Sequence, residues 1–234
     1  MSKSSENNDK PYYRTIRSFV KREGKITTGQ QNAIDELWPN YGVNVCDGLI
    51  DFASLFDRQA PVVMEIGFGN GLSLADMAEN APEINFFGVE VHMPGVGSLL
   101  LQTKQRHLEN VRVSCDDAVE VLKHVPANSL DRMQIFFPDP WHKKRHHKRR
   151  LIQPEFIATV LERLKVGGHL HVATDWENYA EHVMEVLLKN QSLENLGELD
   201  GGFASKPAYR PETKYERRGL NLGHGVWDLV FAKK

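Results

Sequence analysis

The strongest constraint on the fold is a regular alternation of short apolar runs with helix-patterned segments from residue 61 onward. The runs rich in β-branched and aromatic residues are predicted as strands: 62–69, 84–91, 111–115, 132–137, 169–174 and 226–232. The segments between them carry apolar residues at helical spacing: 71–80, 98–110, 118–125, 155–165 and 178–190. Such alternation with near-continuous apolar strands predicts a mostly parallel sheet covered by helices on both faces.

This pattern predicts one α/β domain over residues 61–234, an open twisted sheet of the Rossmann-like type. In such folds ligands bind at the carboxyl ends of the strands. Residues 1–60 are predicted to be an N-terminal extension with a helix near 28–38. The first ten or so residues are polar and are expected to be disordered.

Several classes of protein are excluded by composition. No run of 18 apolar residues is present, so a membrane span is not expected. The N-terminus lacks the apolar segment of a signal peptide. Cys46 and Cys115 are too few for a disulfide framework and lack metal-ligand spacing. We therefore expect a cytoplasmic protein, with no membrane contact and no obligate protein partner.

The net charge of −2 conceals an uneven distribution. Residues 142–150 contain six Lys or Arg and no acid, which leaves 23 bases against 31 acids in the rest of the chain. A second cluster, residues 10–25, contains six bases and one acid. An acidic body with two concentrated basic patches favours docking of a polyanion, although a charge run by itself is more often a solvated loop.

A glycine-rich loop, "EIGFGNG", closes the first predicted strand and opens a helix. Gly67, Gly69 and Gly71 allow the backbone to pass close to a ligand. Acids stand at successive strand ends: Glu65 before the loop, and Glu90 and Asp117 after the second and third strands. One such carboxylate is often only a helix cap, but three in this arrangement indicate a ligand site.

Two cofactors compete for this loop. A dinucleotide also uses an acid at the end of the second strand, but its pyrophosphate requires glycine amides without an anion beside them. Glu65 would repel phosphate there. S-adenosylmethionine fits better, because it has no phosphate and carries an ammonium and a sulfonium. A nicotinamide oxidoreductase of similar fold is the alternative.

The stretch "QIFFPDPWHKKRHHKRR" places Asp139 between two prolines at the end of the fourth strand and at the start of the basic segment. A turn this stiff fixes one carboxylate in space. Together with "EIGFGNG", "GVEVHMPGV", "ATDWENYA" and "RPETKYERRG", it resembles the bacterial tRNA (guanine-N7-)-methyltransferase family over roughly residues 60–234. The proline–aspartate–proline–tryptophan turn with its basic residues is the most specific part.

The resemblance implies a class I methyltransferase fold, S-adenosylmethionine as cofactor and guanosine N7 in the tRNA variable loop as target. It implies that Asp139 is catalytic and that the cofactor is contacted by Glu65, Gly67, Gly69, Gly71, Glu90, Asp117 and Asp139. It assigns the substrate guanosine to Lys143, Asp175, Thr213, Lys214, Tyr215 and Glu216. It assigns the RNA to Arg145, His146, His147, Lys148, Arg149 and Arg150.

Other interpretations remain open from the residues. His142 and His146 have a spacing that zinc sites use, but no Cys or carboxylate nearby completes the ligand set, and no metal is expected. A methyltransferase acting on another RNA explains the same motifs. A non-catalytic RNA-binding protein explains the basic patches but not the glycine loop with its acids.

Overall fold

The computed structural model describes residues 18–19, 24–45, 48–212, 216 and 225–234. Two predictions lie outside these residues. One is the disorder of the first ten or so residues, and the other is the substrate contact of Thr213, Lys214 and Tyr215.

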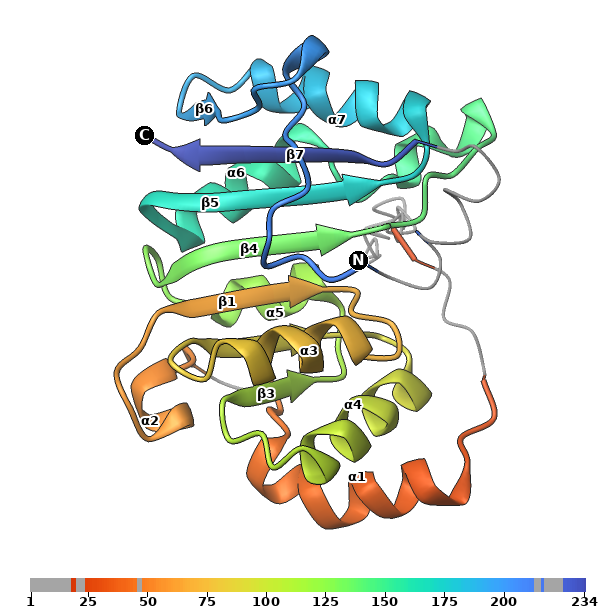
Figure 1. Ribbon diagram of the computed structural model, residues 1–234, viewed down its shortest axis with the longest axis vertical. Helices are drawn as coiled ribbons and strands as arrows, with labels where there is room; N and C mark the ends of the chain where they lie inside the picture. Colours follow the sequence, from red (N-terminus) through yellow and green to blue (C-terminus); the bar gives the residue numbers. More distant parts are fainter. Residues whose placement is uncertain (1–17, 20–23, 46–47, 213–215, 217–224) are drawn as a thin grey trace, which may run out of the picture.

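The described chain forms one seven-stranded sheet in the order β3-β2-β1-β4-β5-β7-β6 (Figure 1). The strands are β1 (Val62–Ile66), β2 (Asn85–Val89), β3 (Val111–Ser114), β4 (Leu130–Phe136), β5 (Leu164–Thr174), β6 (Leu193–Asn195) and β7 (Trp227–Lys233). The first five are parallel, whereas β7 runs antiparallel to both β5 and β6. The predicted fold class is therefore confirmed.

Helices connect the parallel strands. They are α3 (Leu72–Asn80), α4 (Met93–Gln105), α5 (Ala118–His124), α6 (Pro154–Arg163) and α7 (Glu177–Leu188), with α1 (Thr28–Tyr41) and α2 (Phe52–Phe56) before the sheet. Two 3-10 helices complete the described elements, η1 (Lys144–Arg149) and η2 (Asp200–Gly202). The short elements α2 and β6 were not predicted.

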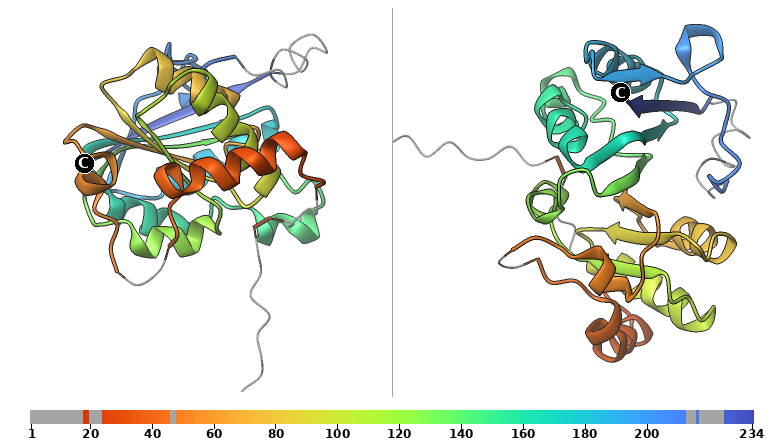
Figure 2. Two further views of the ribbon diagram at one scale, coloured as in Figure 1. Left: turned by 90° about the horizontal axis from the view of Figure 1, so that it is seen from below. Right: turned by 90° about the vertical axis from the view of Figure 1, so that its left-hand side faces the viewer.

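Alternate residues of each central strand enter two separate apolar cores, because strand side chains alternate between faces. Met64 packs with α2, α5, α6 and α7, whereas Val63 packs with α1, α3 and α4. Figure 2 shows α3 and α4 on one side of the sheet and α5 and α6 on the other. Both cores contain fully buried residues, so both layers contribute to stability.

The prediction of helices on both faces holds only for part of the sheet. Over β4, β5 and β7, the face that α3 and α4 cover elsewhere is crossed by residues 203–212 (Figures 1 and 2). On this face of the sheet the polar residues Gln134, His171 and Asp228 are buried.

Gly167 and Gly168 fall between the helix predicted over 155–165 and the strand predicted over 169–174, but in the structure they do not separate a helix from a strand. They lie inside β5, which begins at Leu164. Leu164 already pairs with Leu130, and the register shifts between Leu130 and Arg132. The glycines therefore accommodate an irregularity in the sheet.

The N-terminal extension packs against the sheet domain. Thr27 closes a capping box at the start of α1, and Ala33 of this helix is buried in the α3–α4 core. The amide of Val43 donates to the carbonyl of Val113, which extends the β3 edge. Phe52 and Phe56 of α2 enter the opposite core. Helices long and apolar enough to cross a membrane are absent from the part of the chain that the structure describes.

Candidate active site

A cleft of about 510 Å³ opens at the carboxyl ends of β1, β2 and β4. Its lining residues come from the strand ends and the loops that follow them: Ser18, Phe19, Ile66, Gly67, Gly69, Asn70, Val89, Glu90, Val91, His92, Asp116, Asp117, Ala118, Ile135, Phe136, Pro138, Asp139 and Leu151. This is the edge of the sheet at which α/β folds bind ligands.

The glycine loop presents bare backbone to this cleft. Gly67 and Gly69 have φ values of 75° and 61°, and a Cβ atom added at either would meet no atom within 4 Å. Their open side is therefore free for a ligand that approaches the backbone closely. Gly71 has another role, because it precedes α3 and a Cβ there would collide with Leu99 at 2.6 Å.

Glu90 follows β2 and fixes the loop from across the cleft. Its carboxylate accepts hydrogen bonds from the amides of Gly69 at 2.9 Å, Val91 at 2.7 Å and His92 at 3.0 Å. The same side chain lines the cleft. Glu90 thus joins the ends of β1 and β2 and still presents carboxylate oxygens to a ligand.

Two acids follow β3. Asp117 caps α5 by accepting from the amide of Val119 at 3.0 Å, and Asp116 accepts from the hydroxyl of Ser114 at 3.0 Å. Both line the cleft and an adjoining hollow of about 670 Å³. Asp116 was not predicted, although its place beside Asp117 at the strand end was a signal for it.

Glu65 differs from the other predicted cofactor acids, because it does not line the cleft. It lies within β1, 2% exposed, and accepts a hydrogen bond from the Gln134 amide at 2.8 Å. Burial raises the pKa of the Glu65 carboxyl to about 7, against the hydrogen bond from Gln134 and the charge of Arg132, which lower it. Its contact with a cofactor stays a prediction.

Asp139 is held in a turn with strained ends. Phe137 and Trp141 flank the Pro138–Asp139–Pro140 turn with φ values of 50° and 48°. Bulky residues rarely adopt this left-handed conformation, which costs about 1–3 kcal/mol at each position. The amide of Trp141 donates to Asp139 Oδ1 at 2.9 Å. The turn therefore fixes the carboxylate at the cleft wall.

The basic segment after this turn divides into an exposed part and an anchored part. Lys143, Lys144, Arg145 and Lys148 are exposed. The guanidinium carbon of Arg149 lies 3.9 Å from the centre of the Trp141 ring. Arg150 is only 3% exposed and donates to the carbonyl of Pro140 at 3.0 Å. The anchored arginines thus attach the exposed charges to the turn that carries Asp139.

Arg150 is also bound on its other side. Its guanidinium donates to Asn178 at 2.8 Å and lies 4.9 Å from the centre of the Tyr179 ring. The sequence predicted an RNA contact for Arg150. In the structure its guanidinium contacts Pro140, Asn178 and the ring of Tyr179. His146 and His147 are half-buried. Desolvation, together with the positive charges around it, lowers the pKa of the His146 imidazole.

Asp175 is exposed at the carboxyl end of β5, on the same edge of the sheet as the cleft. The neighbouring Trp176 meets His142 edge to face, with ring centres 4.2 Å apart. This contact brings the start of the basic segment, including Lys143, beside the end of β5. Predicted substrate residues from two distant parts of the chain are therefore neighbours.

Glu216 is placed differently from the expectation for a substrate contact. It is 3% exposed, and both carboxylate oxygens accept hydrogen bonds from Arg210.

The histidines of the basic segment point to separate partners. Among the described residues, no three His, Cys, Asp or Glu side chains gather as metal ligands would.

Comparison with known proteins identifies the family. Residues 59–229 match the family Methyltransf_4, described as "Putative methyltransferase". A protein of Idiomarina loihiensis named tRNA (guanine-N(7)-)-methyltransferase is 57% identical over 94% of this chain and 90% of its own length. A protein of the same name from Psychromonas ingrahamii is 55% identical over 99% of this chain and 97% of its own.

Solved structures support the fold. The 16S rRNA methyltransferase KamB has a TM-score of 0.53 at 14% identity, covering 83% of this chain and 98% of its own. TrmN from Thermus thermophilus has a TM-score of 0.52 at 15% identity, covering 78% of this chain and 47% of its own. With sequence relatives more than half identical over nearly the full length of both chains, this protein belongs to the tRNA (guanine-N(7)-)-methyltransferase family.

Proposed function

We propose that this protein transfers a methyl group from S-adenosylmethionine to N7 of a guanosine in the variable loop of tRNA. The observation that carries the proposal is the position of Asp139. Its carboxylate lines the cleft shared with Gly67, Gly69 and Glu90, and it stands directly before the exposed basic segment. Family membership supplies the reaction class, and the nicotinamide alternative has no support in the relatives.

The cleft suits a cofactor without phosphate. Gly67 and Gly69 offer open backbone, and the surrounding side chains are acidic rather than basic at Glu90, Asp116 and Asp117. Glu90 would hold the ribose hydroxyls, and Asp117 the amine of adenine. When bound, S-adenosylmethionine supplies an electrophilic methyl group. Glu65 would act on its ammonium group from behind the glycine loop.

Guanine N7 carries a lone pair and no proton, so the protein requires no strong base for this reaction. Positive charge develops on the base as N7 is alkylated. The Asp139 carboxylate, held by its turn, stabilises that charge and accepts hydrogen bonds from the ring N–H and exocyclic amine of guanine. Because the turn is rigid before substrate binds, little reorganisation is needed.

The remaining predicted residues serve the substrate. Lys143, Asp175, Thr213, Lys214 and Tyr215 bind the guanosine and its surroundings. The exposed bases Arg145 and Lys148, with His146, His147 and Arg149, contact phosphates, which orient RNA without reading its sequence. Arg150 supports this surface from beneath, through Pro140 and Asn178. The proposed location is the cytoplasm, where tRNA is found.

The proposal is tested by incubating the protein with tRNA and an isotopically labelled methyl donor, followed by mass spectrometry of the nucleosides. Labelled 7-methylguanosine is the expected product. A label in another nucleoside of the tRNA, or no label at all, would overturn the substrate assignment. Thermal stabilisation by S-adenosylhomocysteine and not by NAD is the expected cofactor result.

A further inference from the structure

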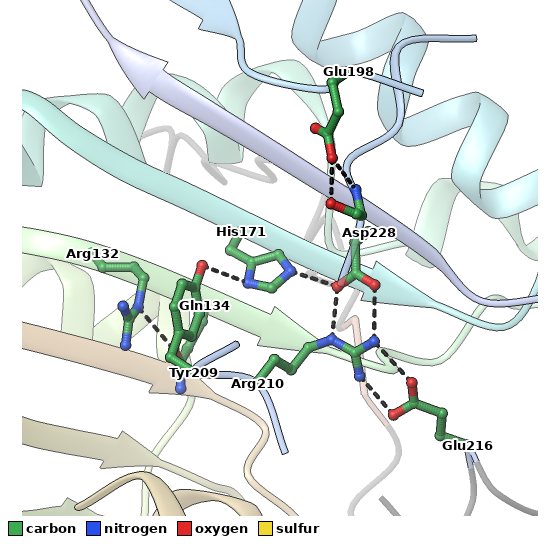
Figure 3. A network of polar contacts seen from close by, with 9 residues as sticks. Arg132, Gln134, His171, Glu198, Tyr209, Arg210, Glu216 and Asp228 are labelled. Atoms are coloured by element: carbon green, nitrogen blue, oxygen red, sulfur yellow. Dashed lines mark hydrogen bonds and ion pairs between the residues drawn. The ribbon is translucent and has the colours of Figure 1, made fainter. Parts of the chain in front are cut away.

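One buried guanidinium is clamped between two carboxylates on the loop-covered face of the sheet (Figure 3). Arg210 donates to Glu216 at 2.7 and 2.9 Å and to Asp228 at 2.7 and 2.8 Å. The three side chains are 2%, 3% and 3% exposed. We call Arg210, Glu216 and Asp228 the Arg210 clamp. It joins β7 to the segment from residue 210 to residue 216.

The clamp is held in one orientation by His171 of β5. His171 Nε2 lies 2.7 Å from Asp228 Oδ1, and Nδ1 lies 2.9 Å from the Tyr209 hydroxyl. An ionised Asp228 only accepts, so Nε2 carries the proton and Nδ1 accepts from Tyr209. Burial lowers the pKa of the His171 imidazole, which is consistent with this neutral form. The Asp228 oxygens are therefore fixed from two directions.

The clamp also packs behind the turn that carries Asp139. The Arg210 guanidinium lies 6.0 Å from the centre of the Phe136 ring and 5.7 Å from that of Phe137. Phe136 in turn meets the His171 ring edge to face at 4.9 Å. Phe137 is the strained residue that leads into Pro138. A shift of Arg210 would therefore change the packing of Phe137 at the base of the turn.

On the opposite side the network continues toward β1. Arg132 lies over the Tyr209 ring at 3.8 Å and donates to Gln134 at 3.1 Å, and Gln134 donates to Glu65. Glu65, Gln134 and His171 are also register partners across β1, β4 and β5. One row of polar groups thus connects the strand before the glycine loop with the clamp.

Buried ion clusters contribute less to stability than their number of contacts suggests, because desolvation of the charges opposes their attraction. Such a cluster imposes one geometry on its members, because a carboxylate that moved away from the guanidinium would become an unpaired buried charge. The Arg210 clamp imposes that geometry on Arg210, Glu216 and Asp228. Glu216 is one of the residues assigned by resemblance to the guanosine.

We propose that Arg210 is a positioning residue that holds Glu216 in register with the turn that carries Asp139. The proposal rests on the proposed function. Glu216 acts through Arg210, because both of its carboxylate oxygens pair with the guanidinium. Glu216 and the catalytic turn then share one buried support.

The first test is Glu216→Gln, which keeps the size and removes one charge of the clamp. The turnover number kcat for tRNA should fall about 10- to 100-fold, as small misplacements of a substrate do. S-adenosylhomocysteine affinity should stay unchanged, because neither Glu216 nor Arg210 lines the cleft. Glu36→Gln is the control, since it removes one carboxylate of an exposed pair with Lys104. A folded Glu216→Gln with wild-type kcat would overturn the proposal.

A second variant covers the case in which the first does not fold. Arg210→Met, Glu216→Gln and Asp228→Asn together remove every charge of the clamp and leave none unpaired, so folding should survive. This neutral variant should bind S-adenosylhomocysteine like the wild type and still have a lowered kcat. A wild-type kcat here would reduce the clamp to a structural ion cluster.

Hydrogen exchange separates failure of the clamp from failure of the proposed function. In Glu216→Gln, the amides of residues 203–212 should exchange faster, while those of β1, β2 and β3 should not change. Absence of 7-methylguanosine with the wild-type protein would refute the function and leave this measurement to decide the clamp. Unchanged exchange over residues 203–212 would refute the clamp even in an active enzyme.

Discussion

The two halves of the sheet satisfy their functional polar groups in different ways. At the ends of β1, β2 and β3, carboxylates bond to nearby backbone amides: Glu90 to Val91 and His92, and Asp117 to Val119. Across β5 and β7, polar and charged side chains bond to each other over long sequence separations, as His171 does to Asp228 and Asp228 to Arg210.

This difference separates two parts of the molecule. We call the ends of β1, β2 and β3 the ligand edge, and the Arg210 clamp with the buried groups around it the support. Carboxylates held only by amides keep oxygens that face the cleft and remain available to a cofactor. The carboxylates of the Arg210 clamp pair with one guanidinium and line no part of the cleft. Asp139 stands between the two halves, at the end of β4. Substitutions in each half should therefore affect different measured quantities.

The largest effect should come from Asp139→Asn. The amide keeps the acceptor for the Trp141 N–H and hence the turn, but it loses the charge that answers the developing cation. Single-turnover methyl transfer should fall about 100-fold or more. The tRNA affinity should change little, and Glu83→Gln, an exposed acid, is the control. Near wild-type transfer would make Asp139 a turn residue only.

Glu65→Gln should change stability in a pH-dependent way. The folded-state pKa of about 7 lies above the ordinary 4.5, so the folded protein binds a proton between these values that the unfolded chain does not. Wild-type stability is therefore lost as pH rises from 4.5 to about 7, by up to roughly 3 kcal/mol. The variant should unfold at higher denaturant concentration at pH 8, and the difference should shrink toward pH 4.5.

An unchanged denaturation midpoint at pH 8 would show that burial of the ionised Glu65 carboxylate does not destabilise the folded protein. The same variant tests the predicted cofactor contact. Weaker S-adenosylhomocysteine binding despite higher stability would assign Glu65 to the ligand edge. Equal binding would assign it to the polar row that leads to the clamp.

Glu90→Ala should weaken S-adenosylhomocysteine binding by about 1 to 3 kcal/mol, because a charged acceptor is removed from the ribose. The amide of Gly69 also loses its partner, so the glycine loop becomes less fixed. Calorimetry measures the change, and Glu216→Gln serves as the matched variant from the other half. Equal affinity in Glu90→Ala and wild type would remove Glu90 from the cofactor site.

The smallest effect concerns the exposed bases. Replacing Lys144, Arg145 and Lys148 with glutamine should make the slope of log K for tRNA against log salt shallower by about 2 to 3. Lys104, Lys123 and Lys189 are exposed elsewhere, and their replacement with glutamine is the charge-matched control. If both triple variants show the wild-type slope, the basic segment is a solvated surface.

Sequence patterns located the ligand edge because its features are local. The alternation of strands and helices, the glycines at 67 and 69 and the acids after β2 and β3 are all visible within short windows. The elements that were missed, α2 and β6, have five and three residues, which is too short for a periodic signal. The antiparallel direction of β7 depends on the long connection before it.

The support could not be predicted in the same way. Arg150 looks like its five basic neighbours in the sequence, yet Asn178 and Tyr179 bury it from 28 and 29 residues away. Likewise, Arg210 and Asp228 are 18 residues apart and meet only because β7 returns antiparallel to β5. Burial of charge depends on tertiary pairing, which no local window contains.

The central claim is that N7 of guanine attacks the methyl group while Asp139 stabilises the resulting cation. Its most direct test is a tRNA transcript in which 7-deazaguanosine replaces guanosine, so that C–H stands where N7 was. The protein should bind this transcript like the unmodified one, since phosphate contacts are unchanged, but should transfer no labelled methyl group to it. Methylation of the 7-deaza transcript at a rate near that of the unmodified tRNA would contradict the account.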